Sequence, residues 1–148
     1  MRTLLLSAIT ALSAISFGQA PRLILDPATS QNNLSVFAAS TQNTQLTARV
    51  LQEADRTLST PLENYSLVQN SLLTTSRDIL ANVMNTSMAY RVTGDSKYKD
   101  YAVRQMLAAA NFPDWYPAHF LGTSEVTLAM AIGYDWLGSS VSEADRTI

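Results

Sequence analysis

Aromatic and polar side chains suited to carbohydrate binding gather in residues 112–120, a stretch interrupted by two prolines. It holds Trp115, Tyr116 and His119, the single histidine of the chain. Flat aromatic rings with a polar tip can stack on a sugar, and an imidazole can exchange a proton near neutral pH. The competing interpretation is structural: the aromatic rings would be core residues, and His119 would brace the next helix through a hydrogen bond. All three are candidate substrate-binding residues.

A second group of candidates follows in the next segment. Tyr134 is a candidate for sugar stacking, whereas Trp136 falls on the apolar face of the expected helix and is expected in the core. Glu125 and Asp135 suggest the paired carboxylates of a glycoside hydrolase, but ten helical residues separate them by roughly 15 Å and 80° of rotation. Hydrolase pairs lie roughly 5 to 10 Å apart. Glu125 is therefore a candidate for substrate binding only.

Other site chemistries lack the residues that they need. With one histidine and no cysteine, the chain offers neither a His-Glu-x-x-His string nor a calcium-loop spacing. Its five glycines form no phosphate-binding loop, and no Gly-x-Ser-x-Gly string indicates a nucleophilic serine. We expect no metal and no cofactor, and we assign no catalytic residue.

Helices must position these candidates, because apolar residues recur at spacings of three and four along most of the chain. Gly94 and Asp95 offer a helix end followed by a helix cap, and Gly138 offers a second helix end. The expected fold class is all-α, built from antiparallel helical hairpins. The predicted helices cover about residues 45–58, 66–92, 96–111 and 123–137.

The first twenty residues have the layout of a secretory signal peptide, with Arg2, an apolar run from Leu4 to Ile15, and small residues before Ala20. The run is shorter than the roughly 20 residues that cross a bilayer, so we expect no membrane span. Residues 21–148 would form the mature domain, secreted or periplasmic. The chain has ten Lys and Arg residues and twelve Asp and Glu residues. It lacks the clustered positive charge that binding to nucleic acid requires, so we expect no nucleic-acid partner.

Strings distributed over residues 21–148 resemble, in order, the heparinase II/III-like and alginate lyase family of polysaccharide lyases. The opening Pro-Arg-Leu-Ile-Leu at 21–25 and the Thr-Gly-Asp turn at 93–95 are similar to the family's, although such turns occur in many helical repeats. The specific pair is Trp-Tyr-Pro-Ala-His-Phe-Leu at 115–121 with Gly-Tyr-Asp-Trp at 133–136.

The resemblance implies an α/α toroid, of which these helical hairpins would form an incomplete part. It also implies β-elimination on uronate-containing polysaccharides, so the expected partner is an acidic polysaccharide. The family's asparagine or histidine for charge neutralisation, and its tyrosine and histidine for proton transfer, lie further along the chain. None of them is carried over here. The family usually has aspartate where this chain has Gly122, so any hydrogen bond of that carboxylate is not expected.

The last residues favour a fragment. Ser142 and Asp145 form a helix-capping pattern, yet the sequence stops at Ile148, one turn later. We therefore expect the N-terminal fragment of a lyase, inactive alone. Two alternatives stay open: a non-catalytic helical module that binds a glycan or a protein, and a fragment of an α/α-toroid glycoside hydrolase. No feature of the sequence sets the oligomeric state.

Overall fold

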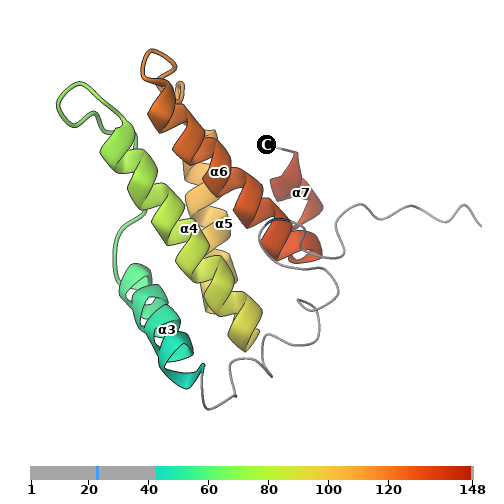
Figure 1. Ribbon diagram of the computed structural model, residues 1–148. Coiled ribbons are helices and arrows are strands. Elements are labelled where there is room, and N and C mark those ends of the chain that lie inside the picture. Colours follow the sequence, from blue (N-terminus) through green and yellow to red (C-terminus); the bar gives the residue numbers. More distant parts are fainter. Residues whose placement is uncertain (1–22, 24–42, 148) are drawn as a thin grey trace, which may run out of the picture.

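The structure, a computed structural model, describes Leu23 and residues 43–147 (Figure 1). Within these residues the chain is helical, which confirms the all-α fold class. The predicted signal peptide at 1–20, and the 21–25 string apart from Leu23, lie outside the described residues. None of the helices in the described part of the chain has the length and apolar character needed to cross a bilayer.

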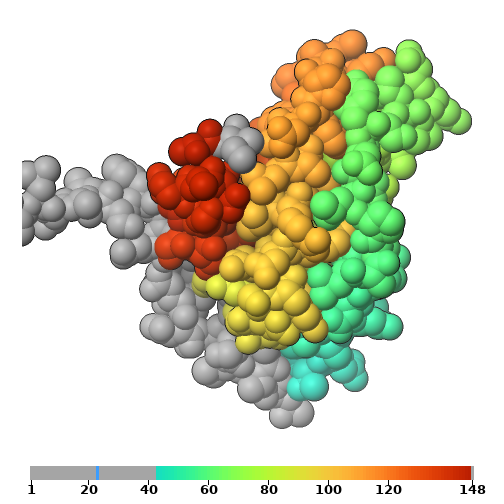
Figure 2. All heavy atoms as spheres, turned by 180° about the vertical axis from the view of Figure 1, so that it is seen from behind, coloured from blue at the N-terminus to red at the C-terminus, as the bar shows by residue number. Residues whose placement is uncertain are grey.

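The four long helices formed by residues 44–137 alternate in direction (Figure 1). As a result α4 and α6 run side by side in the same sense, with α5 behind them and α3 against α4. Seen from behind, the yellow and orange surface of α5 lies between the green surface of α4 with its preceding loop and the red surface of the C-terminal segment (Figure 2). The elements are α3 (Thr44–Leu58), α4 (Leu73–Thr93), α5 (Ser96–Ala110), α6 (Phe120–Leu137), the 3-10 turn η1 (Gly138–Ser140) and α7 (Glu143–Arg146).

The main core lies where α4, α5 and α6 meet. A glycine on α6 makes this meeting close: a Cβ atom added to Gly133 would lie 2.5 Å from Met106 Sδ and 2.8 Å from Val83 Cγ1. Close packing of this kind leaves no room for even one methyl group. The buried residues around this point are Ile79, Val83, Ala109, Val126 and Ala129.

A second, smaller cluster holds α3. Ala54 of α3 packs on Ala89 of α4 and Tyr98 of α5. The Tyr98 hydroxyl donates to Asp55 Oδ1 at 2.8 Å, and Lys97 Nζ lies 3.4 Å from the same oxygen. The hydrogen bond from Tyr98, with help from Lys97, lowers the pKa of Asp55, whereas burial and the same hydrogen bond raise the pKa of Tyr98.

The predicted helix ends at Gly94 and Gly138 are confirmed. Gly94 has a φ of 73°, and its N–H donates to Tyr90 O at 2.7 Å, so α4 stops in the left-handed conformation that glycine accepts readily. Asp95 then caps α5 by accepting from the N–H of Lys97 at 3.0 Å. The α4–α5 hairpin predicted from this turn is therefore confirmed.

Two predicted helix starts are wrong. The helix expected from 66 begins at Leu73, because Gln69 and Asn70 have φ values of 51° and 59° and form a two-residue turn. Val68 and Ser71 on either side exchange two backbone hydrogen bonds of 2.9 and 3.1 Å. The helix expected from 123 begins three residues earlier, at Phe120, immediately after the proline-containing loop.

Candidate functional site

Two loops meet at the end of the molecule where α4 and α6 begin (Figure 1). Residues 59–72 lead into α4, and residues 111–119 lead into α6. We call this surface, with the first turns of both helices, the loop end. It holds three of the candidates from the sequence, Trp115, Tyr116 and His119.

Side-chain contacts join the two loops. The Tyr65 hydroxyl donates to Asp114 Oδ1 at 3.1 Å, and the Tyr116 hydroxyl donates to Asn70 O at 3.0 Å. The Tyr65 ring also meets the Phe112 ring edge to face, with 5.5 Å between centroids. Desolvation, followed by the hydrogen bond to Asp114, raises the pKa of Tyr65. The two loops consequently form one surface.

A buried glutamine of α5 fixes the first loop to the helices. Gln105 is completely buried, and its Oε1 accepts from the N–H of Glu63 at 2.8 Å while its Nε2 donates to Glu63 O at 3.3 Å. Thr75 Oγ1 of α4 donates to Ser66 O at 2.7 Å. These bonds pair backbone groups that would otherwise lack partners, so the loop follows one path.

Every non-glycine residue with positive φ in the described part of the chain lies at the loop end. These residues are Gln69, Asn70 and Tyr116, the last with a φ of 55°. The Tyr116 conformation is held because its N–H donates to Asp114 Oδ1 at 2.8 Å and its hydroxyl is bonded to the first loop. Left-handed non-glycine residues cost energy and are concentrated at binding sites in proteins. This backbone supports the loop end as the candidate site.

Trp115 has a mainly structural role. Its Nε1 donates to Ala109 O at 2.9 Å, near the end of α5, and its ring packs beside the main core. Its own carbonyl oxygen accepts from Thr123 Oγ1 at 2.8 Å. Because the ring is half-buried and its polar atom is used, Trp115 anchors the second loop between α5 and α6.

His119 is exposed at the start of α6, and its imidazole makes no capping hydrogen bond to that helix. The structural interpretation of His119 as a hydrogen-bonded brace is therefore wrong for its side chain. Its backbone does that work, since its N–H donates to Tyr116 O and its carbonyl accepts from the N–H of Gly122, both at 3.0 Å. Next to it, Phe120 is 75% exposed. The sequence reasoning missed Phe120, although its position beside the lone histidine was a usable signal.

Glu125 lies one turn further along α6 and faces α4. Its Oε1 lies 3.7 Å from Arg77 Nε, and the Glu125 side chain is 21% exposed whereas that of Arg77 is 59% exposed. Arg77 was not identified from the sequence. The two residues are far apart along the chain, and only the parallel packing of α4 and α6 brings them together.

The structure does not bring Tyr134 to the loop end. Tyr134 is half-exposed near the other end of α6, roughly 20 Å from Phe120 along the helix, with the Arg146 guanidinium 5.8 Å from its ring centroid. Its neighbours bind the N-terminal part of the chain instead: Asp135 Oδ2 accepts from the N–H of Leu23 at 2.9 Å, and Trp136 Nε1 donates to Leu23 O at 2.8 Å.

Trp136 is almost completely buried, which confirms the expectation that it is a core residue. Asp135 and Glu125 bind different partners, Leu23 and Arg77, at different points of α6. The two carboxylates consequently do not form a hydrolase pair.

Gly122 lies against the start of α4. A Cβ atom there would lie 3.3 Å from Ser76 Oγ and 3.6 Å from Leu73 N. The absence of a side chain lets the first turn of α6 rest directly on the first turn of α4.

Two cavities lie away from these residues. The larger, about 310 Å³, lies between α5 and the segment 140–145. The smaller, about 180 Å³, lies between the end of α3 and α4, and its lining includes Glu63 and Asp78. Desolvation and then the charge of Asp78 raise the pKa of Glu63. Neither of these two cavities contains a candidate residue from the sequence. A third cavity, of about 150 Å³, is lined by the candidate Tyr134, together with Met130 and Arg146.

Among the described residues no group of three or more histidine, aspartate, glutamate or cysteine side chains could hold a metal ion. Neither a scan of protein-family models nor a search of curated proteins finds a match to this chain. The assignment of a function therefore depends on the loop end and on the sequence motifs.

Proposed function

We propose that the chain forms part of the α/α-toroid domain of a secreted or periplasmic polysaccharide lyase that acts on uronate-containing polysaccharides by β-elimination. One observation carries the proposal. The Trp-Tyr-Pro-Ala-His-Phe-Leu string at 115–121 folds as a loop held by hydrogen bonds that runs into the first turn of α6, and His119 and Phe120 are exposed where the loop meets the helix. A rigid backbone that presents an aromatic ring and an imidazole is suited to hold a sugar chain.

The helix arrangement supports a toroid. Consecutive helices are antiparallel, and the helices two apart, α4 and α6, are parallel neighbours (Figure 1). Leu121 and Leu128, which are seven residues apart and therefore lie on one face of α6, also stay exposed at 47% and 45%. Exposed apolar surface on a helix is typical of a face that other elements cover.

Elimination sets clear demands on the protein. A base removes the C5 proton of the uronate, the electron pair forms the C4=C5 double bond, and the oxygen at C4 leaves with the preceding sugar. The substrate carboxylate must be neutralised because negative charge develops beside it. The described residues offer surfaces for binding and orienting the sugar chain, and we assign none of them to the proton transfer.

The test is to express the gene product that contains this chain and to incubate it with alginate, with heparosan and with a neutral glucan. The expected result is a rise in ultraviolet absorbance from unsaturated ends with a uronate polymer but not with the glucan. New reducing ends without this absorbance would identify a hydrolase instead. Absence of both from all three polymers would contradict the proposal.

A non-catalytic glycan-binding module is the second candidate. It is favoured by one observation: the two carboxylates weighed as a hydrolase pair are held apart, with Glu125 paired to Arg77 and Asp135 bonded to Leu23. This candidate expects the gene product to bind a polysaccharide without forming either unsaturated or reducing ends.

A further inference from the structure

Three Asn-X-Ser strings, the acceptor sequence for N-linked glycans, begin at Asn33, Asn64 and Asn85. Asn33 lies outside the described residues, whereas the other two have contrasting surroundings. Two side chains of such a string take part in glycan transfer: the asparagine amide that receives the sugar and the hydroxyl two residues later. The surroundings of these two groups therefore distinguish the string that the folded chain presents from the one that it hides.

The string at 64–66 lies at the surface. Asn64 and Ser66 are both exposed, in the loop of residues 59–72. Asn64 Nδ2 donates to Leu62 O at 3.3 Å, a long bond at the surface that water can replace. Ser66 is held through its backbone carbonyl, which accepts from Thr75 Oγ1 at 2.7 Å, so its side chain is not needed for that contact.

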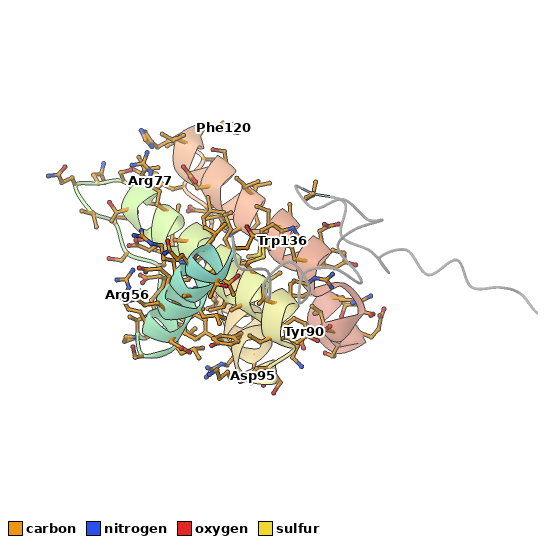
Figure 3. All side chains as sticks on the ribbon, turned by 60° about the horizontal axis from the view of Figure 1, so that its bottom comes forward. Arg56, Arg77, Tyr90, Asp95, Phe120 and Trp136 are labelled. Carbon is orange, nitrogen blue, oxygen red and sulfur yellow. The ribbon has the colours of Figure 1, made fainter. Side chains whose placement is uncertain are left out.

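The position of this loop leaves room for a glycan. The chain between Arg56, near the end of α3, and Arg77, on the second turn of α4, runs along the outer edge of the molecule (Figure 3). Asn64 directly follows Glu63, whose backbone is bound by the buried Gln105, so the path of the loop does not depend on the Asn64 side chain. A glycan on Asn64 would extend into solvent without displacing a packed residue.

The string at 85–87 lies inside α4. Ser87, which carries its hydroxyl, is completely buried, and so is Thr86, whose own hydroxyl donates to Asn82 O at 2.6 Å. Asn85 is partly buried and lines the cavity of about 180 Å³ between the end of α3 and α4. A glycan on Asn85 would push α3 away from α4.

We propose that Asn64 is the acceptor of an N-linked glycan and that Asn85 is not modified, although its string is equally complete. The inference rests on the secreted location in the proposed function, because the transfer takes place in the lumen of the secretory pathway, and it does not rest on lyase activity. In the transfer the Asn64 amide nitrogen attacks C1 of the first sugar of a lipid-diphosphate-linked oligosaccharide. The new C–N bond replaces the C–O bond to the diphosphate, which leaves with the lipid, and the nitrogen gives up a proton.

The test is to express the full chain in a eukaryotic secretory host, once with its own first twenty residues and once with the host's secretion signal in their place. Trypsin cuts after each arginine, so Asn64 and Asn85 fall on separate peptides, 57–77 and 78–91. Peptide N-glycosidase converts a glycosylated asparagine to aspartate, and mass spectrometry detects that change in each peptide of the chain recovered from cells and medium.

With the host signal, a glycan is expected on peptide 57–77 and none on peptide 78–91. Asn64→Gln and Ser66→Ala should each remove the glycan completely, whereas the matched control Asn85→Gln should leave it in place. After enzymatic removal of the glycan, the unsubstituted chain should melt at the same temperature as Asn64→Gln and Ser66→Ala, because neither side chain is packed.

An unmodified peptide 57–77, or a glycan on peptide 78–91, overturns the inference. A glycan on Asn64 that forms with the host signal but not with the chain's own first twenty residues supports Asn64 as the acceptor and contradicts the secreted location in the proposed function. The elimination assay on the gene product decides the lyase activity separately.

Discussion

Replacing Gln105 of α5 with methionine should loosen the loop of residues 59–72 by removing its two hydrogen bonds to the backbone of Glu63. Methionine has a similar length and is unbranched, so it fills the buried space, but it makes neither bond to the backbone of Glu63. Two hydrogen bonds, 2.8 and 3.3 Å long, are lost. At roughly 1 kcal/mol for each net bond, the free energy of unfolding should fall by about 2 kcal/mol.

Thermal unfolding measures this loss. For a chain of this size, 2 kcal/mol corresponds to a decrease in Tm of roughly 5 to 10 °C. The control is Gln52→Met on the exposed face of α3, where surface substitutions change stability by roughly 0.5 kcal/mol or less. The amide proton of Glu63 should also exchange faster with solvent in Gln105→Met, because its acceptor is gone.

Equal melting temperatures for the two variants, with unchanged exchange at Glu63, would refute the reasoning. That result would mean that the loop of residues 59–72 holds its path without Gln105. The bonds made by Thr75 and Tyr116 would then be sufficient.

Three further substitutions test the packing and the electrostatics. Gly133→Ala should cost about 1 to 3 kcal/mol by overpacking the helix crossing, measured by chemical denaturation, whereas Ala131→Gly on the exposed face should cost about 1 kcal/mol at most. Tyr98→Phe should raise the pKa of Asp55 toward its ordinary value, as followed by carboxyl NMR. Because the pKa of Asp55 is lower in the folded chain than in the unfolded chain, Asp55 stabilises the fold at pH values above its ordinary pKa. This contribution is lost as the pH falls through the folded-state pKa, so the variant should lose less stability on acidification. Trp115→Phe should lower stability by about 1 kcal/mol because the indole bond to the end of α5 disappears, and an unchanged Tm would contradict its anchoring role.

The sequence predicts the helical hairpins well because their signals are local. Gly94 and Asp95 end one helix and cap the next in a few residues, and the structure has both features. The turn at Gln69 and Asn70 was not predictable in the same way. It contains no glycine, and the apolar residues around it continue a helical spacing. The turn forms because hydrogen bonds from α5 and from the loop of residues 111–119 hold residues 59–72 in place, and these long-range contacts are not visible in the local sequence.

In the candidate site, too, the features set by local sequence were predictable and those set by long-range contacts were not. Trp115, Tyr116 and His119 are close in sequence, so the sequence was sufficient to place them together. Tyr134 belongs to the opposite end of α6, which helical rise alone determines. The pairing of Arg77 with Glu125 depends on which helices become neighbours, and hydrophobic spacing does not specify that choice.

The two hydrogen bonds that join Asp135 and Trp136 to the backbone of Leu23 bear on the order in which the chain folds. The hairpins of α3 to α6 close through contacts between neighbouring segments, and such contacts form fast. Leu23 is 112 and 113 residues away from its two partners. Because closing so long a loop costs more entropy, we expect Leu23 to bind last, onto a surface that the helices have already built.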